Sequence, residues 1–449
     1  MAAVHGPRLA ADIYEKLTDE EDARVCRDIP ESACRVVPGN FLRVLVSYCC
    51  TKLGDALASP KTVLAWLVTA VGAPGFVLGL LVPIRESGSL IPQLLIGAAI
   101  RRLPVRKWAW VAGSLVQALA IAGLGLAAMT LSGAAAGWAV IALVGAFSLA
   151  RGVCSVAAKD VLGKTIPKTR RGQLNGWSAG AAGLISVVVA LVVLTPDAGV
   201  SDPYRLGSLL IAGAALWVMA ALVYSGIREV AGETGGGGNA VRVALGRLAI
   251  LRDDATFRRF VVTRALLMCS ALSAPFYVAL AHGLSMDSGA AGASGRGIAA
   301  LGLFVVADGL GNLVSGPVWG RLADRSSRQV MVRAALVAAA SGITVFAVQL
   351  CWPALLGSVW FLPGAYFLLC VAHSGVRVGR KTYVVDLGSG NRRTDYVAVS
   401  NSTIGVLLLL AGSVGALVPL IGHAGVLGLL ALLGLAGAAL GRTLPEVQR

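Results

Sequence analysis

The most informative side chains in this sequence are charged residues that lie inside long apolar stretches. Five of them fall near the centres of such stretches: Lys52, Asp55, Arg85, Glu86 and Asp308. A charge at the centre of a bilayer costs about 2.5–3.5 kcal/mol on insertion scales, so these side chains must face water, a solute or one another. They could be ion pairs that lock helices together, or they could line a polar pathway at the midplane. The mixed signs favour a combination of the two, in which ion pairs along the pathway exchange partners when the conformation changes.

We expect the pathway for a solute or ion to be lined by Asp55, Arg85, Glu86, Arg151, Arg264 and Asp308. The arginines among these residues favour an anionic or zwitterionic compound. Asp308 has no basic residue within one helical turn, which makes it the leading candidate to bind a proton. Lys52 lies three residues before Asp55 and could keep that carboxylate ionised. His373 is a further candidate proton site, although a helical histidine is more often a core residue.

The composition predicts that these charges are held by membrane helices. The chain is 56% hydrophobic and 14% charged, whereas soluble chains are about 25% charged. Its 56 glycines suit helices that pack closely in lipid. Twelve apolar segments have the length that a bilayer requires, so the predicted fold is an all-α polytopic membrane protein. The segments are residues 41–72, 74–101, 106–131, 135–158, 172–195, 205–227, 258–283, 298–322, 328–350, 354–377, 395–420 and 423–441.

The basic residues between these segments predict the orientation of the chain. Almost all of them, from Arg102 and Lys107 to Arg380 and Arg393, follow the even-numbered segments, while the opposite loops offer only Arg205 and Arg296. Because basic loops stay in the cytoplasm, we expect both termini inside, in a bacterial plasma membrane. The net charge of +16 is spread over these short loops, which argues against nucleic-acid binding.

A sequence repeat divides the chain into two similar halves. The stretch from Leu78 to Gly97 matches the stretch from Leu301 to Gly320 at a constant offset of 223 residues, and each copy ends in a basic loop. Duplicated membrane bundles of this kind usually build a path for a solute. We predict a cytoplasmic segment at 1–38, a six-helix half at 39–227, a cytoplasmic linker at 228–257 and a second half at 258–449.

The basic loops carry a motif that resembles the signature of the major facilitator superfamily. The second copy, formed by Gly320, Asp324, Arg325 and Arg328, is well kept, whereas the first copy, formed by Gly97, Arg101 and Arg102, has Arg101 in place of the aspartate. The resemblance implies twelve transmembrane helices in two pseudo-symmetric halves. It also implies that the motif holds the inner gate closed. We expect Gly320 to allow a close approach of helices and Asp324 to pair with a basic residue or a helix N-terminus.

The expected function is secondary active transport of a small solute by alternating access, coupled to protons, by a monomer without a cofactor. Gly163-Lys164-Thr165 imitates the end of a phosphate-binding loop, but residue 158 is alanine where glycine is required. The cysteines and histidines show no metal-ligand spacing. His282 and Asp287 have the spacing of an acyltransferase pair, but nothing near them in the sequence supports an enzyme. The alternatives are a non-transporting sensor on a transporter scaffold, a facilitative uniporter and a membrane enzyme.

Overall fold

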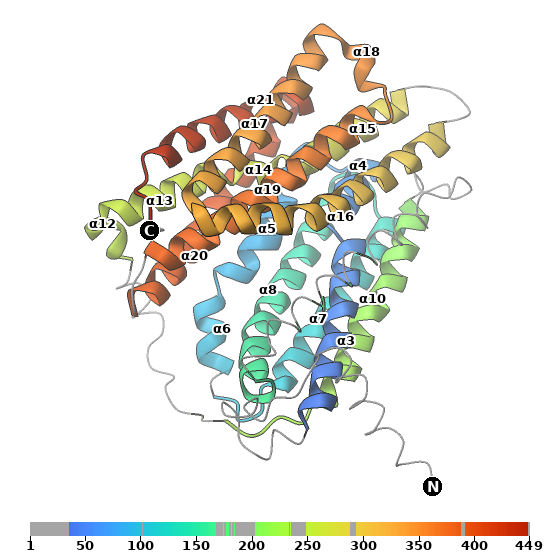
Figure 1. Cartoon of the computed structure of the whole chain (residues 1–449). Coiled ribbons are helices and arrows are strands. Elements are labelled where there is room, and N and C mark those ends of the chain that lie inside the picture. Colours follow the sequence, from blue (N-terminus) through green and yellow to red (C-terminus); the bar gives the residue numbers. More distant parts are fainter. Residues whose placement is uncertain are drawn as a thin grey trace.

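The computed structural model describes residues 36–100, 102–167, 174, 177, 178, 181, 184, 203–232, 234, 248–287, 293–387 and 391–447. Every regular element in these ranges is a helix (Figure 1). The first group of helices is α3 (Val37–Leu57), α4 (Val63–Ala70), α5 (Gly75–Leu90), α6 (Gln93–Ile100), α7 (Lys107–Thr130), α8 (Gly133–Thr165) and α10 (Pro203–Ser225). The second group is α12 (Ile250–Asp253), α13 (Ala255–Leu266), α14 (Cys269–Leu272), α15 (Ala274–Asp287), α16 (Ala293–Arg325), α17 (Ser327–Cys351), α18 (Pro353–Leu356), α19 (Phe361–Leu387), α20 (Asn391–Ala411), the 3₁₀ helix η1 (Gly412–Leu417) and α21 (Val418–Arg442).

Seven stretches of the described chain are long and apolar enough to cross a bilayer, which makes the chain an integral, multi-pass membrane protein. They are Lys107–Thr130, Gly133–Thr165, Pro203–Ser225, Ala255–Leu284, Ser327–Cys351, Phe361–Val384 and Val399–Arg442. The predicted segment at 172–195 lies mostly outside the described residues, as do the N-terminal segment 1–35 and most of the linker.

The first two predicted segments are interrupted helices. The segment at 41–72 divides into α3 and α4 around Pro60, and the segment at 74–101 divides into α5 and α6 around Pro92. A proline has no backbone N–H to donate, and its ring crowds the preceding turn, so a helix tends to break there. The first break leaves Lys61 in a short irregular link between α3 and α4.

The second half contains the same kind of interruption. The segment predicted at 258–283 consists of α13, α14 and α15 in series. The segment predicted at 354–377 extends to Leu387 as α19, ten residues further than expected. Arg380, which we expected in a cytoplasmic loop, is therefore part of this helix.

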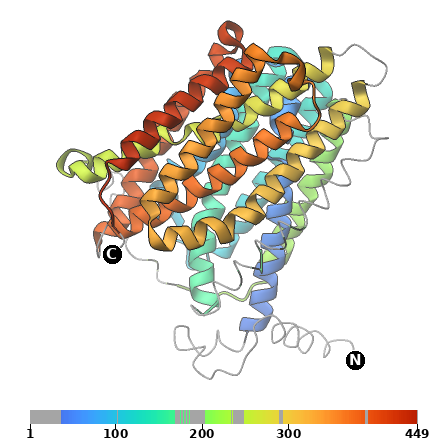
Figure 2. The same ribbon diagram turned by 45° about the horizontal axis from the view of Figure 1, so that its top comes forward.

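The helices form two groups that correspond to the two halves of the sequence. Helix α7 packs against α8 and α10, and α10 packs against α3. In the second half, α17 packs against α19 and α21, and α19 packs against α16. In Figure 1 most of the blue-to-green group lies below the yellow-to-red group, and in Figure 2 the yellow-to-red group lies in front of it.

The two groups meet mainly through α5 against α20 and η1, and through α4 against α15. The contact is closest at glycines, because a Cβ atom added to Gly79 would lie 2.5 Å from the Gly412 carbonyl oxygen and 2.7 Å from the Gly415 Cα. Deeper in the interface, the Ser87 hydroxyl donates to the Gly405 carbonyl oxygen at 2.7 Å. The Trp66 and His282 rings pack edge to face with centroids 4.5 Å apart. The interface between the halves is therefore tight at the ends of these helices that lie away from the basic loops.

This close contact predicts that Gly79→Ala destabilises the protein. The added methyl group would meet backbone atoms of η1, which cannot rotate away, and overpacking of this kind costs about 1–3 kcal/mol. We expect a lower unfolding temperature for the purified protein, followed by tryptophan fluorescence. Gly97→Ala is the matched control, because a Cβ there meets nothing within 4 Å. Equal unfolding temperatures for the two variants would contradict the prediction.

Candidate functional site

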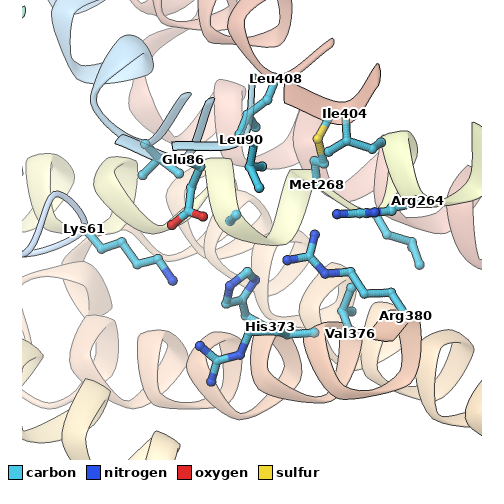
Figure 3. A pocket seen from close by; sticks show the side chains of 14 residues that line it. Lys61, Glu86, Leu90, Arg264, Met268, His373, Val376, Arg380, Ile404 and Leu408 are labelled. Carbon is cyan, nitrogen blue, oxygen red and sulfur yellow. The ribbon is translucent and has the colours of Figure 1, made fainter. Parts of the chain in front are cut away.

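A small cavity lies between the two halves. Its lining combines a group of charged side chains with a larger number of apolar ones. Its volume is about 130 Å³. The first half contributes Lys61, from the break between α3 and α4, and Glu86, from α5. Figure 3 shows these two side chains on one side of the pocket, with the Arg264 and Arg380 guanidiniums on the other. Two segments far apart in the sequence therefore form one polar chamber.

Helix α19 supplies three of the polar side chains of the cavity. His373, Arg377 and Arg380 are spaced by four and three residues, which places them on one face of a helix. The His373 Nδ1 atom lies 3.2 Å from the Ser270 hydroxyl oxygen. Arg377 reaches Asn312 of α16 with a hydrogen bond of 3.4 Å. This spacing is visible in the sequence, but we interpreted Arg380 as a loop charge and did not single out Arg377.

Arg264 is the buried cation of the cavity. Only 7% of the residue is exposed, and it lies in the last turn of α13, which faces α20. Its guanidinium donates to the Ser400 hydroxyl at 2.6 Å and to the Asn401 side-chain oxygen at 2.9 Å. Both acceptors are neutral, and the Nε atom has no hydrogen-bond partner. Among the residues that the structure describes, Arg264 is thus a cation held in place without a carboxylate.

A second charged cluster lies within the first half and joins three helices. The Asp55 carboxylate of α3 accepts hydrogen bonds from Arg85 of α5 at 2.8 Å and from Arg151 of α8 at 2.5 and 2.6 Å. The Arg85 guanidinium also lies over the Phe147 ring, 4.1 Å from its centroid, where the negative face of the ring attracts a cation. The cluster has one carboxylate for two guanidiniums, so it carries a net positive charge.

This cluster corrects the expected role of Lys52. The Lys52 ammonium donates to the Ser178 hydroxyl at 3.0 Å, and Asp55 takes its ion partners from α5 and α8 instead. The arginines of α5 and α8 reach the carboxylate from neighbouring helices, while the Lys52 ammonium bonds to Ser178. Glu86 also points away from its sequence neighbour Arg85, into the cavity between the halves.

Asp308 occupies the position in the second half that Arg85 occupies in the first, at the offset of 223 residues. Its carboxylate accepts a long hydrogen bond of 3.4 Å from the Cys370 thiol. Within the described ranges it makes no ion pair. It does not line the cavity that contains Glu86. The structure therefore brings Glu86 and Arg264 to one chamber and leaves Asp308 beside it.

The motif residues lie at the basic ends of the helices. Gly97 is in α6 and Arg102 is exposed just beyond it, while Arg101 and the side chain of Asp324 are outside the described residues. Arg325 is exposed at the end of α16. A Cβ at Gly320 would meet nothing within 4 Å, so the expectation that this glycine permits a close approach of helices is wrong in this conformation.

Arg328 ties the end of the chain to the start of α17. Its guanidinium donates to the Leu444 carbonyl oxygen at 2.9 Å and lies 3.3 Å from the Glu446 carboxylate. The Ser326 hydroxyl, which caps α17, donates to the same carboxylate at 2.8 Å. The segment that follows α21 therefore fastens the α16–α17 loop.

The first half has a carboxylate in a role like that of Glu446. Glu229, which follows α10, accepts from the backbone N–H groups of Arg106 and Lys107 at 3.0 and 2.7 Å, and from the Lys164 ammonium at 3.1 Å. The two backbone groups begin α7, where the helix dipole favours a negative charge. The Glu229 side chain is fully buried, whereas that of Glu446 is 32% exposed.

The difference in burial predicts unequal effects for two matched substitutions. We expect Glu229→Gln to lower the free energy of unfolding by about 3 kcal/mol, the lower end of the cost of removing one partner of a buried ion pair. Glu446→Gln should cost less than about 1 kcal/mol, as exposed ion pairs do. Urea unfolding of the purified protein at neutral pH measures both. A larger loss at Glu446 would show that burial does not control the strength of these contacts.

Comparisons with known proteins support the fold. No family model matches the chain. It is 25% identical over 283 residues to the uncharacterized protein Rv2209 of Mycobacterium tuberculosis (strain H37Rv), and the match covers 61% of this chain and 51% of that protein. The uncharacterized protein Mb2232 of Mycobacterium bovis matches over the same shares and with the same identity. The chain thus spans about half the length of the curated relatives it matches.

Three solved structures have the same architecture. The nucleoside transporter NupG, as its D323A mutant, superposes with a TM-score of 0.68 at 14% identity, covering 90% of this chain and 99% of that one. A POT family transporter in complex with 5-aminolevulinic acid gives 0.64 at 11% identity, over 89% and 94%. The D-xylose-proton symporter gives 0.62 at 13%, over 93% and 98%. The chain has the fold of these transporters, as the resemblance to the major facilitator superfamily implies.

Proposed function

We propose that this protein is a secondary active transporter that moves a small solute by alternating access, coupled to protons. The observation that carries the proposal is the charged cavity between the two halves, because transporters of this architecture bind their solute at the interface of their repeats. The resemblance in fold to NupG, to the POT family transporter and to the D-xylose-proton symporter supports it.

We further propose twelve membrane helices in two six-helix halves, 39–227 and 258–449, with the cytoplasmic segment 1–38, the linker 228–257 and both termini in the cytoplasm of a bacterium. The excess of basic side chains at one end of the bundle supports this orientation. With the basic loops inside, the tight contact of Gly79 with Gly412 lies near the outer surface. The conformation described here is then closed on the outside. The inner gating role of Asp324 stays a prediction.

Transport should be tested with the purified full-length chain in liposomes that contain the pH dye pyranine and no ATP. A transported solute coupled to protons changes the internal pH when it is added outside. We expect at least one compound in a panel of sugars, nucleosides, peptides, amino acids and organic acids to give such a signal, and empty liposomes to give none. If no compound produces proton flux or gradient-driven uptake, the non-transporting sensor becomes the better account.

A further inference from the structure

We propose that the cavity between the two halves binds a small organic anion, and that Arg264 and Arg380 hold its negative group. This inference rests on the proposed function, since it names the class of solute that the same cavity takes. Among the described residues, the cavity is lined by four cationic side chains, namely Lys61, Arg264, Arg377 and Arg380, and by one carboxylate, that of Glu86. His373 is the remaining titratable group of the lining.

None of the four cations is neutralised within the described part of the chain. Lys61, Arg264, Arg377 and Arg380 make no ion pair there, whereas the arginines of the Asp55 cluster and Lys164 at Glu229 do. Arg377 reaches only the neutral oxygen of Asn312. Like charges that line one cavity repel one another, most strongly at the buried Arg264, whereas water screens the exposed Arg377. An anion that enters would relieve this repulsion.

Arg264 gives the site its anchor. It is 93% buried, its two hydrogen-bond acceptors are the neutral oxygens of Ser400 and Asn401, and its Nε has no partner. A buried guanidinium is stable only when it is compensated, and a planar oxyanion matches its geometry. Figure 3 shows the Arg380 guanidinium beside it, pointing into the same pocket. Two guanidiniums from α13 and α19 thus converge on one point.

The remaining walls indicate an organic rather than an inorganic anion. They are apolar and come from both halves: Val82 and Leu90 from α5, Leu267 and Met268 near α14, and Ile404 and Leu408 from α20. A bare inorganic anion would gain nothing from these surfaces, whereas a short hydrocarbon body would leave water on binding. A neutral zwitterion is the weaker match, because the four cations outnumber Glu86. A carboxylate and a phosphate monoester both meet these requirements.

The test uses the charge of small thiol reagents. In the variant Ala271→Cys, which places a thiol on the cavity wall, we compare anionic sulfonatoethyl methanethiosulfonate with cationic trimethylammonioethyl methanethiosulfonate. Each rate is divided by the rate with free 2-mercaptoethanol and measured by mass spectrometry of the peptide that contains residue 271. The unsubstituted chain reports the background of the native cysteines. We expect the anionic reagent to react about tenfold faster, since a cavity lined by one sign of charge concentrates the opposite one.

Variants and competitors then test whether the positive charge of the cavity accounts for anion binding. Arg380→Gln and, separately, Arg264→Gln should each reduce the rate ratio, while Arg333→Gln on the exposed face of α17 should not. Succinate or methyl phosphate at millimolar concentration should protect the thiol from a neutral methanethiosulfonate, and uncharged succinamide should not. Protection by succinate alone or by methyl phosphate alone would assign the oxyanion.

The proposal is overturned if the cationic reagent reacts as fast as the anionic one. It is also overturned if neither anion protects, or if succinamide protects equally well. The labelling needs no gradient and no flux, so its failure would leave the transport proposal intact. Conversely, anion binding without any gradient-driven uptake would remove the transport proposal and leave this binding site. Because Arg380 is only partly buried, its variant keeps the test decisive if Arg264→Gln does not fold.

Discussion

Replacing Asp55 by asparagine should abolish transport and destabilise the protein. The substitution leaves the guanidiniums of Arg85 and Arg151 facing each other without a negative charge. Removing one partner of a fully buried ion pair costs about 3–5 kcal/mol, and we expect less here because the Arg151 side chain is 41% exposed and that of Asp55 22%. Arg85 is 8% exposed, so water cannot compensate it. We expect a lower unfolding temperature and no solute uptake in liposomes.

A second substitution tests whether the charge imbalance is the cause. In the double variant Asp55→Asn with Arg151→Gln, one of the two unpaired cations is gone, and part of the lost stability should return. Such non-additivity is expected for residues in one ion-pair network. Asp253→Asn, an exposed carboxylate of α12, is the control and should leave the unfolding temperature unchanged. An Asp55→Asn protein as stable as the control would refute the structural role of the cluster.

Glu86→Gln should uncouple solute movement from the pH gradient. An ionised Glu86 repels an anion in the shared cavity, and a proton on Glu86 removes that repulsion, so that solute and proton bind together. Glutamine imitates the protonated carboxyl group permanently. We therefore expect accumulation driven by a pH gradient to be lost while solute exchange at equal pH on the two sides remains, as measured in liposomes.

Asp308→Asn is the comparison that decides between the two carboxylates. The sequence favours Asp308 as the proton site, because no basic residue lies within a turn of it. The cavity contains Glu86 instead. In the described ranges the Asp308 carboxylate accepts a hydrogen bond from Cys370 and makes no ion pair. If Asp308→Asn loses accumulation and Glu86→Gln keeps it, proton coupling belongs to Asp308.

The fold was largely predictable because hydrophobic segments of bilayer length leave few alternatives. The bounds of α7 and α10 lie within about two residues of the expected segments. The breaks at Pro60 and Pro92 were missed, since a hydropathy pattern runs through a single proline without a change. The end of α19 was missed because its charged residues resemble the boundary of a segment. Arg377 and Arg380 imitate the basic end of a membrane segment, although in the folded chain they face a cavity.

The residues of the site were easier to predict than their partners. Asp55, Arg85 and Arg151 were all singled out, because a charge in an apolar segment must be compensated. Which of them pair depends on the rotation of three helices about their axes, and a single sequence does not contain that rotation. Lys52 was therefore assigned to Asp55 on sequence proximity, and the actual pairs bridge 30 and 96 residues.

The glycine contact between α5 and η1 also lies at one end of a long helix, so a small rotation at the contact moves the other end of that helix much further. Helix α20 runs 21 residues from Asn391 to Ala411 before the chain reaches Gly412. At a rise of 1.5 Å per residue its far end lies roughly 30 Å from the contact, so a rotation of about 10° there displaces that end by roughly 5 Å. That displacement is comparable with the width of a small solute, while the glycine backbones beside the pivot shift by much less. In the proposed alternating access, such a rotation would change the opening at one surface while the contact near the other surface stays almost in place.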